Sequence, residues 1–187
     1  MDAWEAVSDG FSPPPVKGRP APRPLLPQPE RVSLATGVLR TSGYTLNDLT
    51  LYATRPAPAQ WRVDLESRQA AGSLSWREAS GAIAGQITAR LKHLALGGAD
   101  DANEADKALS SGSDLSDIPA IDLQAKEFRL YGKNLGELQV LGTNLERGRQ
   151  WRLDKLSITN DAAALNATGA WRLEGPDRGL TVDATVK

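Results

Sequence analysis

The chain has 187 residues and a formal net charge of −1, with 22 lysine and arginine residues against 23 aspartate and glutamate residues. This balance lacks the basic surplus that binding to phosphate backbones requires, so we expect no nucleic-acid partner. Cysteine is absent and histidine occurs once, which removes disulfides, thiolate catalysis and zinc–thiolate sites. No run approaches the ~20 consecutive apolar residues of a membrane-spanning helix.

Residues 1–31 are predicted to form an extended arm. Eight of the twelve prolines fall between Pro13 and Pro29, mixed with basic residues, which is typical of stiff linkers. A ligand for a proline-reading domain is the functional alternative. The N-terminus lacks the apolar region of a signal peptide, so we expect either a cytosolic protein or a piece of a larger exported one.

From Val32 onward apolar residues recur at every second position, which predicts strands with one apolar and one polar face. The runs are Leu49–Ala53, Trp61–Leu65, Leu74–Trp76, Ile83–Leu91, Ile121–Leu123, Phe128–Leu130, Leu138–Val140, Trp151–Leu153 and Leu180–Val186. Glycines at 43, 72, 81, 132, 148 and 179 separate them. Turns this short favour an antiparallel meander, because parallel neighbours need long crossovers.

Residues 97–117 are predicted to be a solvated loop between two β-repeat units, residues 32–96 and 118–187. The segment holds six acidic residues, one lysine and many Gly, Ser and Ala residues. A turn or two near Ala102–Leu109 is the main helix signal. Calcium binding is the functional alternative, but the acids lack the alternate spacing and fixed glycine of a calcium loop.

The two units align with each other at a shift of 89 residues, which places Leu34 over Leu123 and Leu51 over Val140. With one residue of slack, Trp61 falls over Trp151. Repeated strand units of this kind indicate copies that bury their apolar faces only by stacking beside one another. We therefore expect a sheet that grows lengthwise.

Four of the five tryptophans, at positions 61, 76, 151 and 171, are followed directly by arginine. Successive strand residues face opposite ways, so each indole should face the apolar side and each guanidinium the water. One interpretation is a large core residue beside a solvated arginine. The other is tryptophan at the level of lipid headgroups, which suits its amphipathic ring.

Catalytic patterns are absent from the sequence. The single histidine, His93, has no acidic or nucleophilic residue near it in the chain, so we expect it on a strand surface. No nucleophile elbow, dinucleotide fingerprint or phosphate-binding loop occurs. We therefore predict a protein that is not an enzyme, with no catalytic residues, cofactor or metal.

Several segments resemble the AsmA-like proteins of the YhdP type, with Ile118–Leu123, Leu135–Leu138, Trp151–Leu156 and Ala164–Trp171 as the main ones. Asp2-Ala3-Trp4 also resembles a short element that precedes this region in the family. The resemblance implies a repeating β-groove protein of the bacterial cell envelope, implicated in lipid transport between the inner and outer membranes and in the outer-membrane barrier. Because the chain is short and lacks the family's N-terminal membrane anchor, we expect a fragment.

The same family resemblance implies a fold, a set of partners and a location for this chain. The expected fold is all-β, a repeated antiparallel meander that curls into an open groove. The expected partners are phospholipid or another acyl-chain lipid, the remaining β-repeats of the full-length protein, and other envelope proteins. The expected location is the periplasm, as part of a membrane-associated protein anchored in the inner membrane.

Periodicity leaves two alternatives open: a closed sandwich or barrel that binds a small apolar ligand, and an envelope scaffold that acts through its strand edges. For the groove, we expect one parity of each strand to bind lipid. The predicted lining residues are Leu49, Leu51, Trp61, Val63, Leu65, Leu74, Trp76, Ile83, Ile87, Leu91, Ile121, Leu123, Phe128, Leu130, Leu138, Val140, Trp151, Leu153, Leu165, Trp171, Leu173, Leu180 and Val182.

Overall fold

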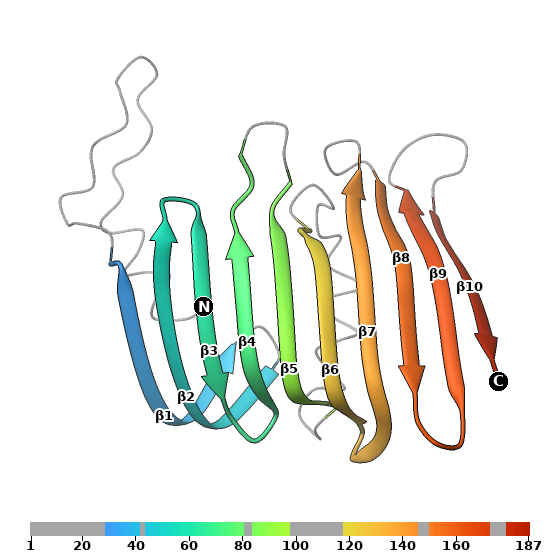
Figure 1. Ribbon diagram of the computed structural model, residues 1–187, viewed down its shortest axis with the longest axis horizontal. Helices are drawn as coiled ribbons and strands as arrows, with labels where there is room; N and C mark the ends of the chain where they lie inside the picture. Colours follow the sequence, from blue (N-terminus) through green and yellow to red (C-terminus); the bar gives the residue numbers. More distant parts are fainter. Residues whose placement is uncertain (1–28, 42–43, 81–83, 98–117, 146–149, 173–178) are drawn as a thin grey trace.

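The structure is a computed structural model that describes residues 29–41, 44–80, 84–97, 118–145, 150–172 and 179–187. These residues form one ten-stranded sheet in which the strands lie in sequence order (Figure 1). The strands are β1 (Arg31–Thr41), β2 (Tyr44–Ala57), β3 (Gln60–Glu66), β4 (Ala70–Arg77), β5 (Gln86–Leu96), β6 (Ala120–Leu130), β7 (Lys133–Leu145), β8 (Gln150–Thr159), β9 (Ala164–Arg172) and β10 (Gly179–Val186). Within the described ranges, no helix is long and apolar enough to cross a membrane.

Several sequence predictions lie outside the described residues. They are most of the proline-rich arm, the acidic segment with its helix signal, and the two lining residues Ile83 and Leu173.

The predicted all-β meander is confirmed, and its sheet is open, with β1 and β10 at opposite edges. Every neighbouring pair is antiparallel except β5 and β6, which run parallel from Gln86↔Ala120 to Leu96↔Leu130. A parallel pair needs a long crossover, and residues 97–119 connect these two strands. The closed sandwich or barrel is wrong for the described strands, because all ten form one sheet and β1 does not pair with β10.

The repeat seen in the sequence is also a repeat of strand register. Leu34 pairs with Leu51 between β1 and β2, and the residues 89 positions later, Leu123 and Val140, pair between β6 and β7. The second hairpin turns through two residues with positive φ, Tyr131 at 49° and Gly132 at 77°. That combination is a type I′ turn, whose twist matches the twist of the flanking strands.

Gly72 was expected in a turn, and that expectation is wrong. It lies inside β4 at φ 146°, where the register with β5 shifts between Ala71 and Gly72. A Cβ at this position would lie 2.3 Å from the carbonyl oxygen of Arg90. Glycine is required here because the ladder contains a bulge and the two backbones come close together. In a sequence, a glycine at such a bulge looks the same as a glycine in a turn.

The core is a cluster on one face of the central strands. Leu91 of β5, Phe128 of β6 and Leu138 of β7 are buried there, together with Ala89 and Ala125. No second layer of described strands covers this face, so neighbouring side chains on the same face bury these residues.

The edge of the sheet below β3 and β4 in Figure 1 is closed by backbone hydrogen bonds. The Arg68 N–H donates to the Asn47 carbonyl at 3.0 Å, and the Ala95 N–H donates to the Gln69 carbonyl at 2.6 Å. The turn between β3 and β4 thus connects β2 to β5. We call this edge, which also carries the Tyr131–Gly132 turn, the turn rim.

Candidate functional site

One face of the sheet is apolar along its whole length. Residues that are Cα partners point to the same side of a sheet, so the register identifies rows of side chains that share a face. One row crosses all ten strands through Leu34, Leu51, Leu65, Gly72, Leu91, Ala125, Leu138, Ile158, Leu165 and Val186. The next row on this face crosses them through Val32, Ala53, Val63, Leu74, Ala89, Leu123, Val140, Leu156, Ala167 and Ala184. Neither row contains a polar side chain.

The row between these two faces the other side and is polar throughout. It consists of Ser33, Tyr52, Asp64, Ser73, Arg90, Gln124, Gln139, Ser157, Asn166 and Thr185. Charged groups on this polar face pair with one another: Arg90 donates to both carboxylate oxygens of Asp122, at 2.9 and 2.8 Å. This hydrogen bonding with Asp122 raises the pKa of Arg90 above its usual value. The sheet therefore separates an apolar surface from a charged, hydrated one.

A third apolar row carries a pair of tryptophans. Trp61 of β3 is the cross-strand partner of Trp76 of β4, and the row continues through Ile87 and Ile121. The next row on this face, two residues closer to the strand ends, contains Trp151 of β8 and its cross-strand partner Trp171 of β9. All four Trp-Arg tryptophans therefore lie on the apolar face, in two cross-strand pairs.

Trp151 fills a gap left by a glycine. A Cβ on Gly142 of β7 would lie 2.2 Å from Cζ2 of the Trp151 ring, so the indole packs directly against the glycine. Its Nε1–H donates to the Pro119 carbonyl at 3.2 Å, two strands away. The tryptophan thus spans β7 and reaches the start of β6, which fixes its ring against the sheet.

The register places 21 of the 23 predicted lining residues on the apolar face, and the other two are Ile83 and Leu173. Their shared face is a finding of the structure, whereas their contact with lipid stays a prediction. The exposed members lie toward the sheet edges: Trp76 is 44% exposed, Val182 53% and Leu180 70%.

Sequence reasoning missed part of this face. Leu94 and Leu96 of β5, and Leu156 and Ile158 of β8, pack against the core cluster. They were missed because β5 and β8 each shift parity once at an irregularity in the ladder. At each shift two polar residues separate the apolar ones, as in Leu153-Asp-Lys-Leu156. That spacing is readable in the sequence and marks a bulge.

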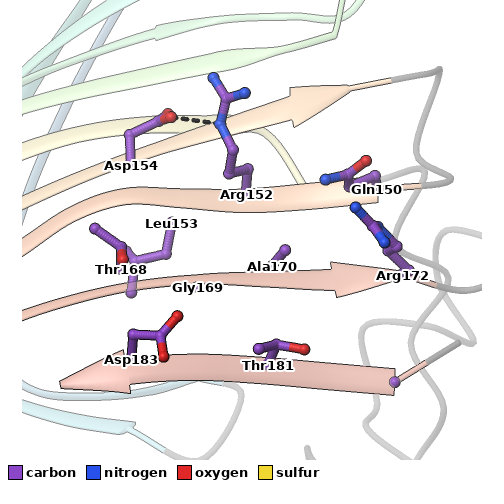
Figure 2. A pocket seen from close by; sticks show the side chains of 11 residues that line it. Gln150, Arg152, Leu153, Asp154, Thr168, Gly169, Ala170, Arg172, Thr181 and Asp183 are labelled. Atoms are coloured by element: carbon purple, nitrogen blue, oxygen red, sulfur yellow. Dashed lines mark hydrogen bonds and ion pairs between the residues drawn. The ribbon is translucent and has the colours of Figure 1, made fainter. Parts of the chain in front are cut away.

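Two depressions lie on the polar face. One of ≈ 760 Å³ is lined by β8, β9 and β10, and Figure 2 shows Arg152 and Asp154 joined there by an ion pair, with Arg172 near the end of β9. A second, of ≈ 610 Å³, includes His93. Both are shallow spaces between charged side chains.

His93 lies on strand β5, where it lines the polar face and is half-buried, and its Nε2 lies 3.1 Å from the carbonyl oxygen of Ser67. The hydroxyl of Ser67 is bonded within its own turn, to the backbone of Ala70. The imidazole therefore contacts the serine carbonyl and does not activate the serine hydroxyl. Among the described residues, no group of acidic and histidine side chains is arranged to hold a metal ion.

An open, single-layer sheet with one apolar and one polar face fits a member of the bridge-like lipid-transfer proteins. The family model described as YhdP protein matches residues 1–186, so the chain belongs to the YhdP family. The resemblance found in the sequence is thereby confirmed. Neither a curated protein nor a solved structure was found to match the chain.

Proposed function

We propose that this chain is a segment of a bacterial envelope lipid-transfer protein. Its apolar face shields phospholipid acyl chains between the inner and outer membranes, and so contributes to the outer-membrane barrier. The segment works in the periplasm as part of a protein anchored in the inner membrane. The observation that carries the proposal is the pair of uninterrupted apolar rows across ten strands, over which no other described strand lies.

The apolar face has the size and the exposure that acyl chains require. Ten strands at ~4.8 Å spacing span about 43 Å, whereas the chains of one leaflet occupy about half of a ~30 Å hydrocarbon core. Val32 and Leu34 on β1 are each 38% exposed, and Val186 on β10 is 68% exposed, so the apolar surface continues to both edges. Soluble monomers rarely leave contiguous apolar patches of this extent uncovered.

Acyl chains also supply enough free energy. Each methylene removed from water contributes about 0.8 kcal/mol, so one chain contributes on the order of 10 kcal/mol before the cost of ordering it. A binding surface made of small and branched aliphatic side chains gives no directional contacts to the chain. It therefore allows a lipid to slide along the sheet.

Strand edges favour a second function, that of an envelope scaffold. The outer edges of β1 and β10 have no strand partner in the described sheet, and every residue of β10 is exposed. Such edges pair readily with further strands. The remaining β-repeats of the full-length protein, or another envelope protein, fit this role by extending the sheet.

Photocrosslinking in cells tests the lipid proposal. A photoreactive amino acid replaces either Leu123 on the apolar face or its neighbour Gln124 on the polar face, within the full-length protein. After irradiation, we expect phospholipid adducts at Leu123 and not at Gln124. Equal labelling of both positions, or protein adducts without lipid at Leu123, would refute the shielding of acyl chains by this face.

A further inference from the structure

The four tryptophans of the apolar face lie at one edge of the sheet. Trp61 and Trp151 are the second residues of β3 and β8, and Trp76 and Trp171 are the residues before last of β4 and β9. Register pairs connect these strand ends along a single edge, at the top in Figure 1. We call this edge the tryptophan rim; it lies opposite the turn rim.

A polar side chain precedes each tryptophan pair at this rim. The Arg55 guanidinium of β2 lies 5.7 Å from the ring centre of Trp61, a cation–π distance. Asn144 of β7, 89 residues later, is the cross-strand partner of Trp151, and its side chain donates to the Ile118 carbonyl at 2.6 Å. Each repeat thus presents a polar group and two indoles, in the same order, across three strands.

The two rims differ in charge. Among the described strands, the first or last three residues at the tryptophan rim include six arginines and one acidic residue, Asp122, which pairs with Arg90. The arginines are at positions 31, 55, 62, 77, 152 and 172. The corresponding residues at the turn rim include three basic and two acidic side chains, at positions 40, 129 and 133 and at positions 64 and 66. By register, five of the six alternate with the apolar residues and lie on the polar face, and Arg55 shares the face of the indoles. Positive charge therefore lines the same rim as the indoles, mostly on the opposite face of the sheet.

The apolar face is long enough along the strands to hold an acyl chain. From Ile121, in the row of Trp61 and Trp76, three steps of two residues or more lead down β6 to Phe128 in the core cluster. At ~3.3 Å per residue this is about 23 Å, whereas the acyl region of one leaflet takes about 15 Å. A chain whose first carbons lie at the tryptophans therefore ends near Ala125 in the core cluster, where the apolar face is most buried.

We propose that the tryptophan rim is the headgroup side of the groove: phospholipids bind with their phosphates at this rim and their chain ends toward the turn rim. This inference rests on the proposed function, since it orients the lipid that the apolar face is proposed to carry. Indoles suit the boundary between chain and headgroup, and guanidinium groups suit phosphate oxygens. The amphipathic indoles, with Arg55 beside Trp61, single out one of two otherwise similar rims.

Quenching of tryptophan fluorescence tests the orientation. The full chain carries Trp4→Phe, so that only the other tryptophans report, and is loaded with phosphatidylcholine bearing a nitroxide either on the headgroup or at the chain end. We expect the headgroup label to quench at least twice as strongly as the chain-end label at equal occupancy. Stronger or equal quenching by the chain-end label, with lipid bound, overturns the orientation but leaves the proposed function intact. Absence of bound lipid, measured by extraction, contradicts the proposed function itself.

A charge-removal pair tests the phosphate contact. Arg55→Gln removes the arginine beside Trp61 at the tryptophan rim, and Arg40→Gln removes an arginine from the same face at the turn rim as a matched control. The readout is the preference for phosphatidic acid over diacylglycerol with the same chains. We expect the first variant to lose roughly tenfold of this preference, the scale of one charge-assisted hydrogen bond, and the control to lose less than twofold. Equal losses, or a loss only in the control, overturn the proposal, and Arg55→Lys should restore most of the preference.

Discussion

The contact between Gly142 and Trp151 predicts that adding a single methyl group destabilises the sheet. In Gly142→Ala, the new Cβ would lie 2.2 Å from Cζ2 and 2.5 Å from Cη2 of the Trp151 indole. Both are well inside van der Waals contact, so the ring must leave its place on the sheet. Leaving it breaks the hydrogen bond of Nε1 to the Pro119 carbonyl.

The expected cost follows from these two effects. Overpacking of a filled site costs typically ~1–3 kcal/mol, and loss of a hydrogen bond costs about 1 kcal/mol. We expect Gly142→Ala to lower the free energy of unfolding by about 3 kcal/mol. With a urea m-value of about 2 kcal/mol/M, the unfolding midpoint falls by about 1.5 M.

Urea unfolding followed by circular dichroism measures this change. Gly37→Ala is the matched control, because a Cβ on Gly37 of β1 meets nothing within 4 Å, and its effect should stay within about 0.5 kcal/mol. In a Trp151→Phe background the smaller ring leaves room for the methyl group, so Gly142→Ala should cost less there than in the native chain. Equal costs for Gly142→Ala and Gly37→Ala, or an unchanged cost in the Trp151→Phe background, would refute the assigned packing.

Two further substitutions probe the sheet around the parallel pair. Gly72→Ala should cost more than Gly132→Ala, by about 1–3 kcal/mol, because both glycines have positive φ but only Gly72 also faces a backbone oxygen; equal melting temperatures would contradict the close approach. The ion pair of Arg90 with Asp122 joins β5 to β6 and is partly exposed, so a double-mutant cycle with alanine should give a coupling of about 1 kcal/mol or less. Hydrogen bonding to Asp122 raises the pKa of Arg90. The stability contributed by a basic group with a raised pKa is lost only as pH rises through that pKa, so the coupling should be the same at about pH 7 and about pH 10. A coupling that disappears at the higher pH would be inconsistent with this pair.

Period-two alternation predicted which residues of most strands lie on the apolar face. In a strand without a bulge, odd-numbered and even-numbered residues point to opposite faces, so position in the sequence fixes the face. Trp61, Val63 and Leu65 on β3 are the simplest case, since β3 pairs with β4 without a shift. The prediction failed for Leu156 and Ile158, where β8 contains an irregularity. One extra residue moves every later side chain to the other face. A prediction that follows every second residue therefore assigns the wrong face to residues beyond the bulge.

Topology was harder to predict than strand faces. A strand with one exposed face shows the same alternation of apolar and polar residues whether its neighbour is antiparallel or parallel. The residues around Ile87 and Ile121 therefore did not indicate that β5 and β6 run in the same direction. The length of the segment between residues 97 and 117 was the only available signal, because it is long enough for a crossover. Whether the sheet stays open was likewise undecidable from alternation, since a barrel and a groove have the same pattern.

The central claim is that the apolar face holds lipid, and native mass spectrometry with lipid extraction tests it most directly. The full chain, purified from bacterial cells with residues 1–31 intact, is compared with Val140→Asp and with Gln139→Asp. Val140 lies in an apolar row and Gln139, its neighbour, in the polar row. We expect near-stoichiometric phospholipid on the native chain and on Gln139→Asp. We expect none on Val140→Asp, where a carboxylate would have to enter the hydrocarbon. A stable native chain without lipid, or equal lipid loss in both variants, would contradict this claim.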